Sequence, residues 1–175
     1  KGLLDTLDAL DSAGIPYMGI GENDTDSRKP YFIEQDGIRV GFINVCEHEY
    51  SYATPTRRGA NPFDPFLTMQ DIREARAQCN FLIVIYHGAK EHCQYPSPRV
   101  YNMAHEMVHC GADVVLTQHS HCIGCYEQYE GAHILHGQGN FNFVYSQFKT
   151  PTWDKALLVE LNIDKKIDIV FHPIV

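Results

Sequence analysis

Two short apolar segments, each closely followed by histidine, constrain the fold of this chain more than any other feature. Residues 81–86 (FLIVIY) run into His87, and residues 113–117 (DVVLT) precede His119 and His121. Both segments are rich in β-branched residues and lack helical spacing, which predicts strands that are buried on both faces. Strands of this kind are typical of α/β proteins with a largely parallel sheet.

Helical patterns precede both segments and also open the chain. Leucines at helical spacing predict a first helix that Gly14 ends. Thr68 and Asp71 resemble a capping box and predict a second helix before residue 81. Ser97 as N-cap and Pro98 at the first helical position predict a third helix. The buried stripe of this third helix is predicted to be Val100, Met103, Ala104, Met107 and Val108.

Strand patterns at both ends of the chain complete the predicted fold. Residues 31–35 and 38–45 flank an Asp-Gly turn, which is a strong local signal for a hairpin. Four later segments, residues 126–129, 132–136, 156–163 and 167–171, predict antiparallel strands. The sum is a single α/β domain over residues 1–175, a layered sandwich of mixed sheets flanked by helices.

The acidic balance of the chain argues against two classes of partner. With 14 basic and 22 acidic residues the net charge is -8, so neither nucleic acid nor an anionic membrane is expected as a partner.

No segment has the length of a transmembrane helix or the pattern of a signal peptide. The six cysteines are expected to be mostly reduced, because a chain of 175 residues needs no disulfide framework.

The three histidines at the strand ends predict a divalent-metal site. Ligands of open α/β sheets gather beyond the carboxyl ends of the strands, and neutral imidazole is the commonest metal ligand. In an extended segment His119 and His121 would point to the same side. One buried histidine alone would be read as a hydrogen-bonded core residue, but three at two strand ends favour metal ligation. Glu91, four residues after His87, is a candidate fourth ligand or acid-base group.

Polar residues in two loops are candidates for contact with a substrate. The long loop at residues 46–67 carries Glu47, Glu49, Asn61 and Asp64, and a loop of this length is either functional or a solvated surface segment. Asn140, between Gly139 and Phe141, could present its carboxamide to a substrate or occupy a left-handed turn.

Two further motifs have competing interpretations. Residues 105–109 (HEMVH) match the H-E-x-x-H pattern of zinc proteases, with both histidines on one helical face. The helix is expected to end two residues after His109, and His105 lies off the apolar stripe, so a solvent-facing coincidence is favoured. Cys122 and Cys125 form a C-x-x-C pair, but the chain has no second pair to complete a zinc knuckle. Packing cysteines are the favoured interpretation.

Six motifs, taken in order and spacing, resemble one known family. They are GIPYMGIGEN, KPYFIEQDGIRVGFINVCEHEYSYAT, ANPFDP, HGAKEHCQYPSP, GADVVLTQHSHCIGCYEQYEG and GQGNFNF. From about residue 14 to residue 143 the chain resembles the CapA family of bacterial poly-γ-glutamate capsule biosynthesis proteins. The resemblance implies a metallophosphatase-like (calcineurin-like phosphoesterase) fold.

The resemblance also implies roles for particular residues. His87 matches the histidine of the family's HxGxE segment with Glu91 as its acid, and His119 and His121 match its GHxH-like element. These histidines would be metal ligands. The residues expected to line the same cleft are Glu47, Glu49, Asn61 and Asp64.

The chain departs from the family pattern in two ways. Gln118 replaces the usual glycine before His119, and the aromatic residue that often follows the position of His87 is absent. The family's early aspartate and Asn-His motifs would precede Lys1. The resemblance therefore implies the later part of a domain, with half of a two-metal site and a first helix that packs against strands outside this chain.

Four functions stay open from the sequence. The first is a CapA-like, metal-dependent hydrolase acting on poly-γ-glutamate or on a small phosphorylated or peptidic substrate, with Mn, Zn, Fe or Mg as cofactor and His87 and Glu91 as catalytic residues. The others are a generic phosphoesterase, a zinc protease using His105, Glu106 and His109, and a non-catalytic polymer-handling component. The resemblance implies a bacterial protein that is cytoplasmic or associated with the cell envelope.

Overall fold

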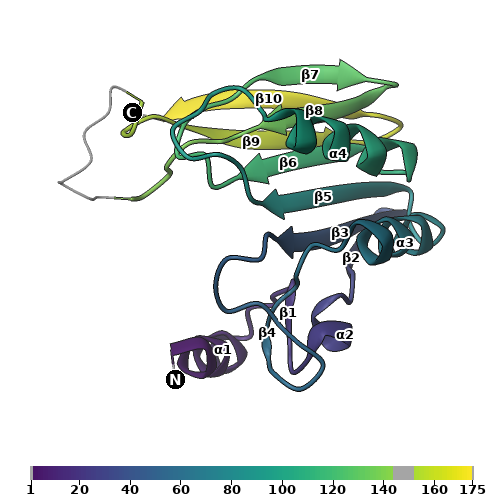
Figure 1. The fold of residues 1–175 in the computed structure, drawn as a ribbon. Helices are drawn as coiled ribbons and strands as arrows, with labels where there is room; N and C mark the ends of the chain where they lie inside the picture. The colour runs from purple at the N-terminus through teal and green to yellow at the C-terminus, as the bar shows by residue number, and fades with distance from the viewer. Residues whose placement is uncertain (1, 144–151, 175) are drawn as a thin grey trace.

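A six-stranded mixed sheet forms the centre of the computed structural model, which describes residues 2–143 and 152–174 (Figure 1). Its strands, in spatial order, are β2 (Tyr31–Gln35), β3 (Ile38–Cys46), β5 (Phe81–His87), β6 (Val114–Gln118), β8 (Ala132–His136) and β7 (Tyr126–Tyr129). The four inner strands are parallel, and the edge strands β2 and β7 are antiparallel to their neighbours. The two apolar segments therefore form adjacent central strands, as predicted.

Two helices and a hairpin cover the two faces of this sheet. Helices α3 (Pro65–Arg76) and α4 (Pro98–His109) lie on one face, and the hairpin of β9 (Ala156–Ile163) and β10 (Ile167–Ile174) lies on the other (Figure 1). Alternate residues of β5 face opposite layers: Leu82 and Val84 pack toward the helices, while Ile83 packs toward the hairpin. The expected layered α/β sandwich of mixed sheets is confirmed.

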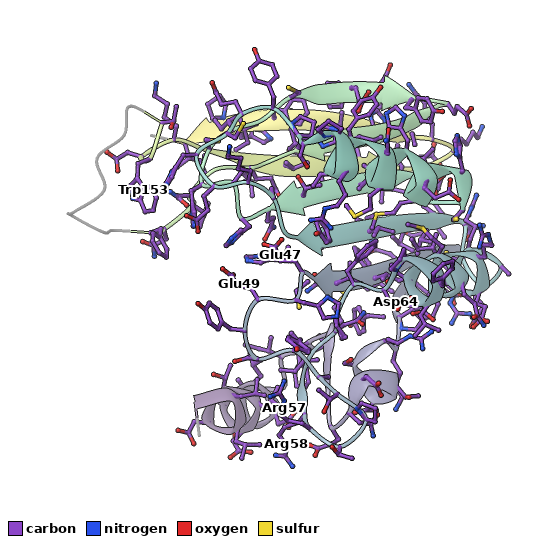
Figure 2. All side chains as sticks on the ribbon, in the orientation of Figure 1. Glu47, Glu49, Arg57, Arg58, Asp64 and Trp153 are labelled. Atoms are coloured by element: carbon purple, nitrogen blue, oxygen red, sulfur yellow. The ribbon has the colours of Figure 1, made fainter. Side chains whose placement is uncertain are left out.

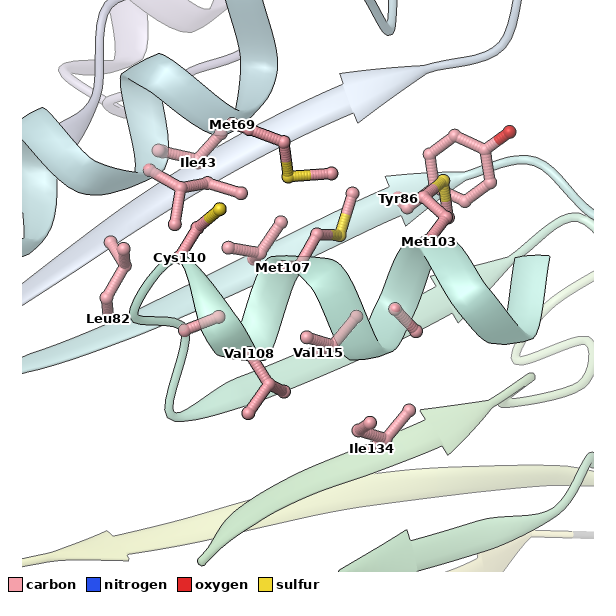
Figure 3. Close-up of a cluster of buried hydrophobic side chains, with 14 of the residues drawn as sticks. Ile43, Met69, Leu82, Tyr86, Met103, Met107, Val108, Cys110, Val115 and Ile134 are labelled. Atoms are coloured by element: carbon pink, nitrogen blue, oxygen red, sulfur yellow. The ribbon is translucent and has the colours of Figure 1, made fainter. Parts of the chain in front are cut away.

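Helix α4 follows the sequence pattern closely. The Ser97 hydroxyl accepts a hydrogen bond from the Val100 amide at 3.3 Å, and Pro98 occupies the first turn. All five residues of the predicted stripe are buried, and Figure 3 shows Met103, Met107 and Val108 on the side of the helix that faces the sheet. The packing of this stripe against β5, β6 and β8 forms the larger core.

Helix α3 begins four residues earlier than the sequence pattern suggests. Its N-cap is Asp64, whose Oδ1 accepts hydrogen bonds of 2.9 Å from the amides of Phe66 and Leu67. Pro65 supplies the first helical residue. The hydroxyl of Thr68 accepts from the Asp64 amide at 3.2 Å, so the reciprocal cap joins Asp64 and Thr68 rather than Thr68 and Asp71.

Strand β8 differs from the expected antiparallel pattern of the last third. It pairs in parallel with β6 and antiparallel with β7. All five of its residues are buried, which suits an inner strand covered on both faces. The β9–β10 hairpin is antiparallel as expected, and the turn before β8 uses Glu130 and Gly131, both at positive φ.

A smaller unit lies below the sheet in Figure 1. It consists of α1 (Gly2–Ala13), β1 (Ile20–Gly21), α2 (Asp24–Ser27) and β4 (Gly59–Ala60), with β1 and β4 antiparallel. Helix α1 ends before Gly14, as predicted, and none of its residues is buried.

All six cysteines are free thiols. The longest helices of the described residues have 12 residues, and none is long and apolar enough to cross a membrane.

Candidate metal centre

Three imidazoles meet at the carboxyl ends of two central strands. His87 is the last residue of β5 and pairs with Gln118, the last residue of β6, so that His119 follows directly beside it. The ring centroids of His87 and His119 are 4.9 Å apart, and those of His119 and His121 are 5.6 Å apart. The parallel register thus brings together the three histidines that the sequence singled out.

The backbone that carries these rings is not extended, contrary to the expectation from the sequence. His119 and His121 have φ values of 81° and 53°, in the left-handed region that side chains rarely adopt. Left-handed non-glycine residues are concentrated at functional sites, where the surrounding structure holds the strain. The side chain of Gln118, which replaces the family's usual glycine, donates to Gln138 Oε1 at 3.1 Å.

Three carboxylates converge on one nitrogen of His119. Its Nε2 lies 3.5 Å from Glu47 Oε1, 3.8 Å from Glu49 Oε2 and 3.6 Å from Glu91 Oε1. The Glu47 amide donates to the His87 carbonyl at 2.9 Å, which continues the pairing of β3 with β5 beyond the strand end. Figure 2 shows Glu47 and Glu49 beyond the arrowhead of β3, at the carboxyl edge of the sheet.

Two groups of side chains offer ligand atoms close enough to share a cation. Glu91, His119 and His121 form one group, and Glu47, Glu49 and His119 form the other, each with its ligand atoms within 4.8 Å of one another. His119 belongs to both groups, whereas His87 belongs to neither although its ring adjoins His119. Imidazole nitrogen with carboxylate oxygen suits Zn, Mn or Fe better than Mg or Ca, which prefer oxygen alone. The donor set therefore fits a divalent transition metal.

The charge state of His87 also suits a ligand or base. Desolvation, followed by the neighbouring His119, lowers the pKa of His87 below its ordinary value. The neutral ring, which has a free lone pair, is therefore favoured at neutral pH.

Asn140 lies against a histidine instead of facing open space. Its Oδ1 is 2.7 Å from Nδ1 of His121, and its Nδ2 donates to the Trp153 carbonyl at 3.0 Å. Because Oδ1 can only accept, Nδ1 of His121 carries the proton and Nε2 keeps its lone pair. The left-handed residue of this turn is Gly139, with φ of 76°, not Asn140. The structure therefore differs from the interpretation of Asn140 as the left-handed residue of a turn, and it gives the side chain an orienting contact with His121.

Asn61 and Asp64 lie apart from the histidines. Asn61 is 2% exposed and donates to the Asn44 carbonyl at 3.0 Å, and Asp64 caps α3. Neither lines the cavity beside Glu47 and Glu49. The structure thus places neither residue in the lining of this cavity: Asp64 is engaged as the cap of α3, whereas Asn61 Oδ1 is buried without a hydrogen-bond partner among the described residues.

The H-E-x-x-H histidines contact β7 and lie outside both ligand groups of the described residues. His105 Nε2 is 3.2 Å from Glu127 Oε1, and its ring stacks on Tyr129 at 3.8 Å. His109 Nε2 is 2.9 Å from the Tyr129 hydroxyl. These contacts favour a structural role for the motif.

The C-x-x-C pair is likewise packed: Cys122 is buried, and the Cys125 thiol contacts the Gln94 carbonyl.

A cavity of about 610 Å³ opens beside the carboxylates. Its lining includes Glu47, Glu49, Glu91, His119, Tyr86 and Arg99. Sequence reasoning missed Tyr86 and Arg99, and it missed Trp153, whose ring stacks on His121 at 5.0 Å. Each of these three lies in a strand, helix or loop whose local pattern indicates no chemistry. Composition alone could have drawn attention to Trp153, because it is the single tryptophan of the chain.

Two solved structures define the fold class. The putative 5'-nucleotidase from Staphylococcus aureus, in complex with alpha-ketoglutarate, is similar with a TM-score of 0.57 and 16% identity, over 95% of this chain and 34% of that chain. A hypothetical protein from Thermus thermophilus is similar with a TM-score of 0.53 and 14% identity, over 82% of this chain and 60% of that chain. The fold is that of the metallophosphatase-like proteins.

The chain belongs to the bacterial capsule synthesis protein PGA_cap family, whose sequence pattern matches residues 1–145. It is 29% identical over 164 residues to the capsule biosynthesis protein CapA of Bacillus anthracis, covering 90% of this chain and 39% of that protein. It is 28% identical over 162 residues to the PGA biosynthesis protein CapA of Bacillus subtilis (strain 168), covering 90% and 42%. The chain thus spans about two fifths of the length of these curated relatives.

Proposed function

We propose that this CapA-like protein binds a divalent metal with the cluster around His119 and hydrolyses a substrate in the synthesis of the poly-γ-glutamate capsule. The observation that carries the proposal is the approach of three carboxylates to His119 Nε2, at 3.5 to 3.8 Å. Carboxylates so close together repel one another, so their convergence is costly unless a cation neutralises them.

Particular residues are assigned to the metal and to proton transfer. His119 would hold a cation either with His121 and Glu91 or with Glu47 and Glu49, because the lone pair of one imidazole nitrogen binds a single metal. When bound, such a metal lowers the pKa of water toward about 7 and polarises a phosphoryl or acyl oxygen.

His87 and Glu91 are proposed as the proton-transferring groups. The neutral ring of His87 accepts a proton, and the side chain of Glu91 is 52% exposed, which lets it exchange that proton with solvent. Glu91 serves in this role when it is not occupied as a ligand.

The substrate class rests on two lines of support. The family and the curated relatives carry the names of capsule and PGA biosynthesis proteins, which supports poly-γ-glutamate or its γ-glutamyl fragments. The fold neighbour named a putative 5'-nucleotidase supports a phosphate ester. Both reactions use the same chemistry, an attack of activated water on an electrophilic centre.

The test compares metal content and hydrolysis in the His119→Ala variant and in a control, His172→Ala. His172 contacts Glu160 on the β9–β10 hairpin, away from the cluster. The unaltered protein and the control are expected to retain metal by elemental analysis and to hydrolyse bis-p-nitrophenyl phosphate or γ-glutamyl oligomers. His119→Ala is expected to lose both properties. Equal metal content in all three proteins would overturn the proposal.

The same measurements, with a His105→Ala variant added, separate the alternatives. Hydrolysis of the phosphodiester alone favours a generic phosphoesterase, and bound metal without turnover favours a non-catalytic polymer-handling component. Loss of metal in His105→Ala, with metal retained in His119→Ala, would favour the zinc protease.

A further inference from the structure

We propose that Arg99 and the hydroxyl of Tyr86 form a subsite for an oxyanion of the substrate, a carboxylate or a phosphate, in the cavity beside the metal-binding cluster. Both residues line that cavity together with Glu47, Glu91 and His119. The inference rests on the proposed function and deepens it, because it specifies the substrate group that is held beside the reacting bond.

Arg99 provides the positive charge of this subsite. Its side chain lies on the exposed first turn of α4 and, within residues 2–143 and 152–174, has no carboxylate at ion-pair distance. By contrast, Arg28 forms a two-pronged pair with Asp71. A guanidinium presents several donors in a plane that matches a carboxylate or a phosphate. Arg99 is therefore free to hold such a group.

Tyr86 provides a buried hydroxyl whose charged neighbour in the cavity is Arg99. The residue is 0% exposed, and its hydroxyl has no hydrogen-bond partner in the part of the chain that the structure describes. Figure 3 shows this hydroxyl pointing away from the apolar cluster that surrounds the ring. An unpaired buried hydroxyl is costly, so its presence indicates a partner that arrives from the cavity.

The surroundings keep this hydroxyl protonated. Burial raises the pKa of Tyr86, opposed by the positive charge of Arg99, which acts on the same oxygen. A β-carbon on Gly88 would lie 2.6 Å from the hydroxyl oxygen, so only glycine leaves this space open.

The helix that carries Arg99 adds to the positive potential. Helix α4 has 12 residues, and its first turn bears the positive end of the helix dipole. Ser97 caps the Val100 amide, and Pro98 has no amide proton. The Arg99 amide, in the first turn of the helix, has no acceptor inside the helix.

The carboxylates of the cavity make this subsite dependent on metal. Glu47, Glu49 and Glu91 together carry more negative charge than Arg99 can offset, so an oxyanion is repelled while they are bare. Cations on these carboxylates reverse the balance. The oxyanion is then held between the cations and Arg99, which selects substrates with a negative group close to the scissile bond.

The test titrates inorganic phosphate and glutarate, separately, into the protein by calorimetry with Mn²⁺ and again with chelator. The variants are Arg99→Gln, Tyr86→Phe and the control Arg73→Gln, which alters an exposed arginine of α3 near Glu106. With Mn²⁺, Arg99→Gln is expected to weaken binding at least about 10-fold and Tyr86→Phe about 3-fold to 10-fold, from the loss of charged and neutral hydrogen bonds. The control is expected to bind as the unaltered protein does.

The outcomes separate this inference from the proposed function. Metal content is measured in every variant and is expected to equal that of the unaltered protein. An unaltered protein that holds no metal counts against the proposed function only. Weaker binding of phosphate alone, or of glutarate alone, identifies the substrate group. The subsite is refuted if neither probe binds the unaltered protein. It is also refuted if, with and without Mn²⁺, Arg99→Gln binds both probes as well as the unaltered protein does. Tyr86→Phe keeps the ring, so its fold is checked by an unchanged melting temperature.

Discussion

At the scale of single residues, His119 is the point where the candidate metal centre converges. Its ring adjoins His87 and His121, and its Nε2 faces three carboxylates. The side chain is 12% exposed, so the surrounding groups hold it in one place. His121 is oriented differently, through the contact of its Nδ1 with Asn140. Metal-binding histidines are commonly oriented by such a second hydrogen bond.

Asn140→Ala is therefore expected to weaken metal binding without removing a ligand. Loss of the 2.7 Å contact frees the ring of His121 to rotate and to change tautomer. The dissociation constant for Mn²⁺ or Zn²⁺ is expected to rise about 10-fold to 100-fold, measured by competition with a chelating dye. Asn142→Ala, an exposed asparagine two residues away, is the control. An unchanged constant in Asn140→Ala would contradict the orienting role.

At the scale of elements, α4 is joined to the edge of the sheet by one carboxylate. Glu127 on β7 lies 3.2 Å from His105 of α4 and 3.0 Å from His136 of β8. Burial alone would raise the pKa of Glu127, but the hydrogen bonds from His136 and His105 outweigh it and lower the pKa below its ordinary 4.5. The H-E-x-x-H histidine thus has a structural partner, which accounts for its place off the apolar stripe.

Glu127→Gln is expected to destabilise the protein by about 1 kcal/mol at neutral pH, through the loss of a charged hydrogen bond. Because the folded-state pKa is depressed, the stabilisation is present above the unfolded value and is lost as pH falls through the folded value. The difference from the unaltered protein should therefore shrink as pH falls below the ordinary value of 4.5, as followed by urea denaturation. Glu34→Gln, an exposed glutamate on β2, is the control. A difference that does not change with pH would count against this account.

At the scale of the whole molecule, part of the negative charge gathers where the strands end. The net charge is -8, and Glu47, Glu49 and Glu91 converge on one nitrogen at the carboxyl edge of the sheet. Such a cluster opposes folding when it is bare and supports folding when cations bind it. The stability of the whole domain is therefore expected to depend on metal.

Adding Mn²⁺ or Zn²⁺ at about 100 times the dissociation constant is expected to stabilise the fold by about 2.7 kcal/mol. For a chain of this length the melting temperature should rise by roughly 5–10 °C relative to chelator. The combined variant Glu47→Gln, Glu49→Gln and Glu91→Gln should show no rise, and in chelator it should melt no lower than the unaltered protein. Both are measured by thermal unfolding, and an undiminished rise in the variant would place the metal elsewhere.

Local patterns were sufficient for the elements of this fold. The apolar runs at residues 81–86 and 113–117 became adjacent inner strands, and the cap at Ser97 with its five-residue stripe became α4. The stripe of α4 succeeds because burial of one face repeats at the period of the helix, and the two strands succeed because a continuous apolar run suits burial on both faces. For α3 the local pattern predicted the wrong cap, because the helix begins after Asp64 with Pro65, four residues before the predicted start.

Tertiary structure alone decided how the site is arranged. The sequence determined that histidines follow two buried strands, and hence that they lie at one edge of a parallel sheet. The order β3-β5-β6 decided that Glu47 reaches His119, and the left-handed turn after β6 decided where the rings of His119 and His121 lie. Such contacts join segments that are distant in sequence. Hydrophobic periodicity and motif spacing cannot predict them, because both describe only the residues along one helix or strand.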